Sequence, residues 1–188
     1  MTKMDREVAK IFRKILRDIK VDLADEFDRN FERQAFFSEA WQRRKSPVRG
    51  DGHILMDSGA LRRSITSRSD DRSITFFSDL PHAAIHNEGG EIKVTRKMKA
   101  FFWHKYYEAV GGFGRKKNGS LRQDKRNRQL SSEADFYKAM ALMKVGDSVK
   151  IPRRRFLGTS PVLEERVKKI VEENLASYFE TYITDTLK

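Results

Sequence analysis

The sequence predicts an α+β fold in which long N-terminal and C-terminal helices pack against a mostly antiparallel sheet. Two observations favour this class: apolar residues recur at helical spacing near both ends of the chain, and short segments with strand-like alternation lie between them. Such segregated helices and strands pack in layers around one core. With 188 residues the chain suits one domain, so we expect residues 1–188 to fold as a unit.

The first predicted helix lies within a helical region at residues 1–45. Phe36, Phe37 and Trp41 either extend this helix or begin a second short one. Proline and glycine then interrupt the pattern between residues 45 and 52. The apolar stripe of the long helix comprises Val8, Ile11, Phe12, Ile15, Leu16, Ile19, Leu23, Phe27 and Phe31.

The α+β core is predicted at residues 55–95 and 145–182. Asp57 or Ser58 caps its first helical turn, and turn residues separate the segments that follow. The elements of the first part, in order, are a helical turn through Leu61, strands at 65–69 and 73–78 that form a hairpin, a two-turn helix from Pro81 that ends at Gly89 and Gly90, and a strand at 91–95.

The second part of the core begins with a strand at residues 145–151 and ends with a long helix. Ser160 is suited to the N-cap of this helix, and Pro161 to its first position, where a missing N–H costs nothing. The apolar face comprises Leu163, Val167, Ile170, Val171, Leu175, Tyr178, Phe179 and Tyr182.

Residues 96–146 are predicted to form an inserted basic helical arm, with helices at 101–110 and 131–143 and a mobile, glycine-rich tip between them. Residues 91–158 carry 18 Lys/Arg and 6 Asp/Glu, which accounts for the whole net charge of +12. Such a patch attracts phosphate backbones or acidic protein surfaces, and a solvated basic loop is the ordinary alternative. The candidate contact residues are Arg115, Lys116, Lys117, Arg122, Lys125, Arg126, Arg128, Arg153 and Arg155.

The composition excludes several classes of protein. No cysteine is present, so disulfides, thiolate metal sites and cysteine nucleophiles are ruled out. No apolar run approaches the roughly 20 residues that a membrane helix needs, and the N-terminus lacks the apolar block of a signal peptide. We therefore expect a soluble protein made in the cytosol, without a membrane contact.

Two histidines raise the question of a metal site. His82 and His86 are four residues apart on a predicted helix, and Glu88 follows just beyond them. A catalytic zinc ion needs three protein ligands, but Glu88 lies outside the pair, and His53 and His104 have no local partner. We expect no metal and no cofactor. His86 is expected to bond backbone near the glycine turn, and His82 to be partly exposed.

Other patterns do not predict an enzyme. Residues 114–120 have the glycine spacing of a P-loop, but Ser120 stands where the phosphate-binding lysine is required. No serine lies in a nucleophile-elbow context. The aromatic run at residues 101–107 suits a core or an oligomer contact, and base stacking is its alternative.

The segment IPRRRFLGTSP, residues 151–161, is a compact junction between a strand and a capped helix. Its Phe-Leu pair is expected to anchor in the core while the three arginines project. Together with DSGALRRSI and PHAAIHNEGG, in this order, it resembles the phage virion morphogenesis family. The matching positions are Ser58, Gly59, Leu61, Ser64 and Ile65; Ala83, His86, Asn87 and Gly89; and Pro152, Arg154, Phe156, Leu157 and Gly158.

The resemblance covers roughly residues 55–182 and implies a small structural protein of tailed phages and prophages. It implies tail completion or neck assembly at the head-to-tail junction, self-association into a ring, contacts with neighbouring tail or neck proteins, and no enzymatic activity. The implied location is the virion and, during assembly, the cytoplasm of the bacterial host. His82 departs from the family pattern, in which tyrosine is frequent, and the His-Asn-x-Gly element is implied to be a fold-defining turn.

Two other functions stay open from the residues themselves. One is a sequence-independent nucleic-acid-binding protein that uses the basic arm for a nonspecific DNA contact. The other is a metal-dependent hydrolase with His82 and His86 as ligands.

Overall fold

The computed structural model describes residues 3–48 and 52–186. Residues 49–51, which belong to the segment where proline and glycine were predicted to interrupt the helical pattern, lie outside this description. The α+β class is confirmed, since long helices accompany short antiparallel strand pairs. Within the described residues, the strands form three two-stranded sheets and no continuous one. The helices therefore pack on each other as much as on strands.

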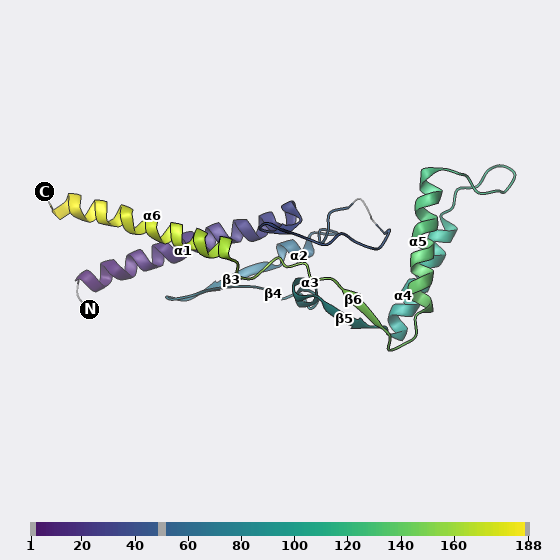
Figure 1. Ribbon diagram of the computed structural model, residues 1–188, viewed down its shortest axis with the longest axis horizontal. Coiled ribbons are helices and arrows are strands. Elements are labelled where there is room, and N and C mark those ends of the chain that lie inside the picture. The colour runs from purple at the N-terminus through teal and green to yellow at the C-terminus, as the bar shows by residue number, and fades with distance from the viewer. Residues whose placement is uncertain (1–2, 49–51, 187–188) are drawn as a thin grey trace.

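The molecule is elongated (Figure 1). Helices α1 (Lys3–Arg33) and α6 (Pro161–Thr186) run along each other at one end, and both termini lie there. A hairpin of α4 (Arg96–Gly111) and α5 (Lys125–Leu142) stands at the opposite end. The short helices and strands lie between these two helix pairs.

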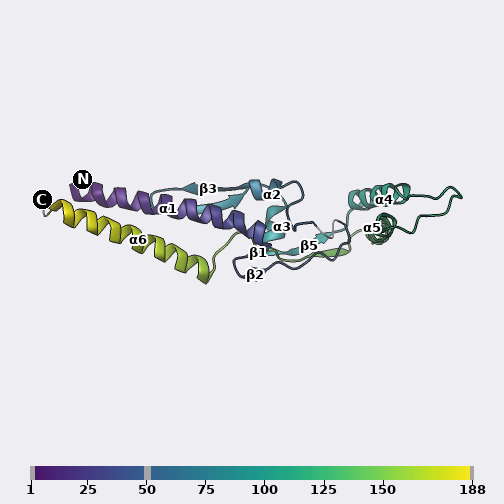
Figure 2. The same ribbon diagram turned by 90° about the horizontal axis from the view of Figure 1, so that it is seen from above.

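Helices α1 and α6 run side by side (Figure 2) and pack through part of their predicted apolar stripes. Ile15, Ile19, Leu23 and Phe27 of α1 are buried in one cluster with Leu163 of α6. Other residues of α6 and of the neighbouring hairpin complete this cluster as partly buried neighbours, namely Val167, Ile170, Val171, Ile74 and Phe76. The prediction of two long amphipathic helices is confirmed.

Helix α6 begins as its sequence predicts. The Ser160 hydroxyl accepts a hydrogen bond of 3.1 Å from the backbone N–H of Leu163, and Pro161 is the first helical residue. Arg166, one turn later, pairs with Asp22 at 2.5 Å and with Glu26 at 3.4 Å on α1. The cap and the ion pairs fix where the two helices meet.

The chain after α1 differs from the prediction. Gln34 and Phe37 have φ values of 55° and 53°, which end the helix and turn the chain into a hairpin of β1 (Ala35–Phe36) and β2 (Glu39–Ala40). The predicted helical extension is therefore wrong, and the 1–45 region is helical only to Arg33. The hairpin buries Phe36 and Trp41, so burial of these rings decides the local structure.

The predicted hairpin in the core is confirmed. Strand β3 (Ile65–Ser69) pairs antiparallel with β4 (Ile74–Ser78), with Ile65 opposite Ser78. The short helix α2 (Ala60–Arg63) precedes it, and Ser58 Oγ accepts from the backbone N–H of Ala60 at 3.3 Å. Gly59, with a φ of 71°, occupies the cap position itself.

A third strand pair joins the two halves of the core. Helix α3 (Ala83–Glu88) leads into β5 (Gly90–Lys93), which pairs antiparallel with β6 (Ser148–Ile151). The predicted strand at 145–151 starts late, because Asp147 Oδ2 accepts from the backbone N–H of Lys144 at 2.8 Å and closes a turn there.

The inserted arm is a helical hairpin with its own apolar seam. Phe102 of α4 lies 6.4 Å from Phe136 and 6.3 Å from Tyr137 of α5, measured between ring centroids. Thr95 caps α4 and Asp124 caps α5. Because of this second cap, α5 begins six residues before the predicted helix at 131–143, so the basic loop is shorter than predicted.

A second buried cluster lies at the centre of the molecule. Phe156, which is 1% exposed, packs against Phe31 with 5.4 Å between ring centroids, and Phe31 meets Trp41 edge to face at 5.4 Å. Residues Ile54, Leu61 and Ala83 complete this cluster. It joins α1, α2, α3 and the segment before α6.

The predicted anchoring role of Phe156 is testable by truncation. Phe156→Ala should lower the free energy of unfolding by about 3–5 kcal/mol, because it leaves a cavity beside Phe31. Arg153→Ala serves as the control and should change it by less than about 0.5 kcal/mol, since its side chain is 57% exposed. Urea denaturation measures both, and equal small effects would remove Phe156 from the core.

Candidate interaction surfaces

The predicted family-motif residues meet at one junction. The Asn87 side-chain oxygen accepts hydrogen bonds from the backbone N–H groups of Phe156 at 2.9 Å and Leu157 at 3.0 Å, and its amide donates to the Leu157 carbonyl at 3.1 Å. The His86 carbonyl accepts from the Arg154 N–H at 2.8 Å. Helix α3 thereby clamps the segment that leads into α6.

Gly89 is required by the close approach of this segment. Its φ is 73°, and a Cβ built on it would lie 2.8 Å from the backbone nitrogen of Arg153. Both the conformation and the contact exclude a side chain at this position. Gly158, on the other side of this segment, has a φ of 145°, which L side chains rarely adopt, and a Cβ there would displace the flexible guanidinium of Arg155.

The opposite side of the segment is held by the N-terminal part of the chain. Trp41 Nε1 donates to the Arg155 carbonyl at 2.6 Å, and Asn30, which is 0% exposed, donates to the Phe156 carbonyl at 3.4 Å. The sequence reading missed both Asn30 and the hydrogen bond of Trp41. Asn30 could have been predicted as a buried hydrogen-bonding residue, because it stands directly beside the apolar stripe and a buried amide needs partners.

The three arginines of the junction have different environments. Arg153 is exposed and lies 3.8 Å from Glu88. Arg154 is 8% exposed, donates to the Gln42 carbonyl at 3.0 Å, and has its pKa lowered by burial and by nearby Arg44. The expectation that all three project is wrong for two of them, because the Arg155 guanidinium packs over the Phe36 ring at 4.4 Å.

The first motif contacts the same cluster from the other side. Leu61 is 5% exposed and packs with Phe156, and Ile65 is a partly buried neighbour. The Ser64 hydroxyl donates to the Leu61 carbonyl at 2.7 Å and lies 2.6 Å from the hydroxyl of Ser78. The structure thus brings all three motifs together around one aromatic core.

The two histidines lie on α3 with ring centroids 5.9 Å apart. His82 is exposed, whereas His86 Nδ1 is buried and has no hydrogen-bond partner within the described residues. Burial lowers the pKa of His86, and the nearby His82 and Arg154 lower it further. Residues 3–48 and 52–186 contain no group of three metal-binding side chains. The backbone carbonyl of His86, and not its imidazole, makes the expected hydrogen bond.

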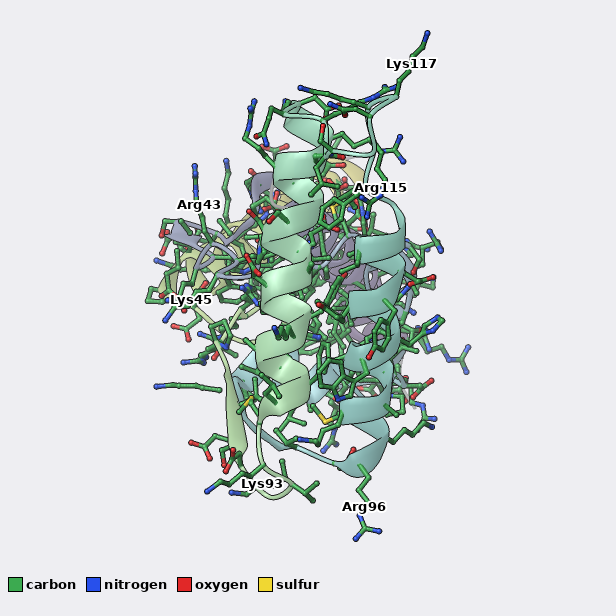
Figure 3. The ribbon with its side chains drawn as sticks, turned by 90° about the vertical axis from the view of Figure 1, so that its right-hand side faces the viewer. Arg43, Lys45, Lys93, Arg96, Arg115 and Lys117 are labelled. Carbon is green, nitrogen blue, oxygen red and sulfur yellow. The ribbon has the colours of Figure 1, made fainter. Side chains whose placement is uncertain are left out.

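The basic candidates separate into two places. Arg115, Lys116, Lys117 and Arg122 lie in the loop at the far end of the arm (Figure 3), and α5 carries the others, Lys125, Arg126 and Arg128, in its first turns. Arg153 and Arg155 lie at the junction instead. The arm residues therefore form one surface, to which the junction arginines do not contribute.

A third surface lies between the free ends of α1 and α6. A groove there is lined by apolar and aromatic side chains from both helices, with Glu7 as its one charged member. Its most exposed members are Phe179 at 56%, Tyr182 at 53% and Val8 at 50%, with Leu175 at 37%. A run of exposed large apolar side chains marks an interaction surface.

Comparison with known protein families agrees with the motif-based resemblance. The model of the phage virion morphogenesis family matches residues 2–176. The chain belongs to this family. It is a virion-associated protein with a role in virion assembly. No curated protein and no solved structure gives a significant match. Over the described ranges, every helix is too short or too polar to cross a bilayer.

The clamp of this family member is testable at Asn87. Asn87→Ala leaves the N–H groups of Phe156 and Leu157 without their acceptor, so the free energy of unfolding should fall by about 1–3 kcal/mol. Asn118→Ala, the same change in the exposed loop of the arm, should cost less than about 0.5 kcal/mol. Thermal denaturation compares the two variants, and equal melting temperatures would refute a stabilising role for the Asn87 hydrogen bonds.

Proposed function

We propose that this protein acts at the head–tail junction as a tail-completion or neck component. It associates with copies of itself into a ring and contacts neighbouring tail or neck proteins. Its role is structural, requires no cofactor, and is exerted in the host cytoplasm while particles assemble. The observation that carries the proposal is the uncovered apolar groove between α1 and α6 in a member of a virion morphogenesis family.

The groove supports self-association because the apolar stripes continue beyond the core. Near the centre of the molecule, Ile74 and Phe76 of the β3–β4 hairpin cover the helix pair. Towards the termini no described element covers it, and the groove-lining rings of Phe179 and Tyr182 on α6 are about half exposed. A helix surface of this kind is stable in water when another apolar surface covers it.

The charges of α1 and α6 favour a second copy as the occupant. The two helices together carry 12 Lys/Arg and 14 Asp/Glu, so they are close to neutral. The outer face of α6 pairs its own charges, with 3.9 Å between Lys168 and Glu172 and 3.8 Å between Lys169 and Glu173. A near-neutral groove can therefore contact a different surface of the next copy without strong charge repulsion, and heterologous contacts of this kind close into rings.

A structural role is also supported by the carboxylates with lowered pKa values. A hydrogen bond from Arg62 lowers the pKa of Asp28, and one from Lys105 lowers that of Glu108. The pKa of Asp70 is lowered by the backbone N–H of Arg72 in a turn. These carboxylates are held as anions in ion pairs and a turn, so each contributes to the local structure.

The proposed place of action is tested by inactivating the gene in its phage or prophage. Electron microscopy of the lysate should show filled heads and separate tails, and the wild-type gene supplied in trans should restore joined particles. Joined particles in the absence of the protein would contradict a role at this junction. Loss of heads alone would place the protein in capsid assembly instead.

Self-association is tested by a charge in the groove. Phe179→Glu should lower the molar mass measured by light scattering to that of a monomer, because the charge is costly to bury in a groove lined by Leu175 and Tyr178. Val162→Glu is the matched control, since Val162 is 51% exposed on the same helix but does not line the groove. A monomeric wild-type protein, or equal effects of the two changes, would refute the groove as the interface.

A further inference from the structure

The arm is built to hold its tip away from the rest of the molecule. Ala109, Ala134 and Ala141 are buried in the seam between α4 and α5, where small side chains allow close packing. Figure 1 shows the loop that joins the two helices at the far corner of the molecule. We define this tip as residues 112–128, which comprise the loop and the first turn of α5.

The tip has a defined backbone path. Asn127, which is 6% exposed, accepts from the Gly114 N–H at 2.8 Å and donates to the carbonyls of Gly114 at 2.8 Å and Arg122 at 2.7 Å. Within the loop, the Lys116 N–H donates to the Ser120 carbonyl at 2.8 Å. A buried amide with these bonds fixes both ends of the loop, and so fixes where its charged side chains begin.

The tip presents seven positive charges that the protein itself does not neutralise. All seven side chains are exposed, and none forms an ion pair with a residue in the described ranges. The single carboxylate, Asp124, is occupied as the N-cap of α5, where it accepts from the Asn127 N–H at 2.8 Å. The seven are Arg115, Lys116, Lys117, Arg122, Lys125, Arg126 and Arg128.

Two further features add to this positive field. Lys125 and Arg126 stand in the first turn of α5, at the positive end of the helix dipole, where cations are unfavourable. Gln129 donates to the Pro47 carbonyl at 2.8 Å, which brings the segment with Arg43 and Lys45 alongside α5 (Figure 3). Uncompensated like charges of this density are stabilised by a polyanion.

The chemistry of the tip fits a phosphate backbone better than a protein. Protein interfaces have apolar or aromatic centres and few lysines, whereas the single exposed large apolar side chain of the described tip is Leu121 at 39%. DNA interfaces are polar and strongly positive. Binders of single strands stack bases on aromatic side chains, but the tip has only the half-buried Phe113, which favours a duplex.

We propose that the tip of the α4–α5 hairpin binds the phosphate backbone of double-stranded DNA without reading its sequence. Arginine and lysine side chains supply charge and hydrogen-bond donors to phosphate oxygens, and contacts to phosphates carry no base information. The surface is separate from the groove between α1 and α6, so one copy can associate with others and hold DNA at the same time.

The test uses the full-length protein and a fluorescent duplex of about 25 base pairs in two unrelated sequences, with anisotropy measured from about 50 to 200 mM NaCl. The two sequences should bind with the same affinity within about twofold. The affinity should fall steeply with salt, by a log–log slope of about −0.9 for each neutralised phosphate.

The decisive variant is Lys116→Gln, Lys117→Gln, Arg126→Gln, which spares the arginines bonded to loop carbonyls. Its affinity at 100 mM NaCl should fall by about tenfold or more, with a slope less steep by about 2–3. The matched control, Arg72→Gln, Lys93→Gln, Lys150→Gln, removes three exposed charges from the β3–β4 turn and the β5–β6 strand pair, outside both the tip and helices α1 and α6, and should bind within about twofold of wild type.

Several results would overturn the proposal. These are an absence of DNA binding at low salt, a preference for one sequence, or equal losses in the tip variant and its control. A tip variant that keeps its DNA affinity but loses its oligomeric mass would show that the tip contacts protein. Unchanged melting temperatures of both variants establish that they are folded, and since the groove is intact in both, failure here is distinct from failure of self-association.

Discussion

The hydrogen bonds between the Asn87 side chain and the backbone at Phe156 and Leu157 constrain the rest of the fold. They join two segments that lie about seventy residues apart and hold Phe156 against Phe31. The same segment fixes the start of α6, and hence the angle at which α6 meets α1. Because β5 follows α3 directly, the clamp also sets where the strand pair that carries the arm begins. The hydrogen bonds of one asparagine side chain therefore help to position both the α1–α6 pair and the α4–α5 arm.

The sequence predicts the parts of this fold that local patterns decide. Ser160 and Pro161 define the start of α6, and the alternation at 65–69 defines β3, because capping and pleating are properties of neighbouring residues. The three motifs were also assigned from their order along the chain. The structure explains their co-occurrence, since all three contact the cluster around Phe156.

The remaining features depend on contacts that are distant in sequence. The helical spacing of Phe36 and Trp41 predicted a helix, but both rings reach buried sites only through a hairpin. Arg154 was predicted to project from the surface, but its guanidinium is buried and donates to the Gln42 carbonyl, which is distant in sequence. The start of α5 was missed because Lys125 and Arg126 are unusual in a first turn, where the helix dipole disfavours them. Tertiary burial, and charges placed against local preference, account for these differences.

The arm enters and leaves the core at two residues that face each other. Lys93, at the end of β5, pairs in register with Ser148, at the start of β6, so about fifty residues are inserted between adjacent positions of one ladder. A short turn between the same two strands would preserve their pairing, since the entropy of closing a loop changes only slowly with its length. The arm is thus an insertion whose length and sequence can change without altering the pairing of β5 with β6. Lengthening, shortening or replacing the arm would therefore leave the Asn87 contacts and the α1–α6 pair unchanged.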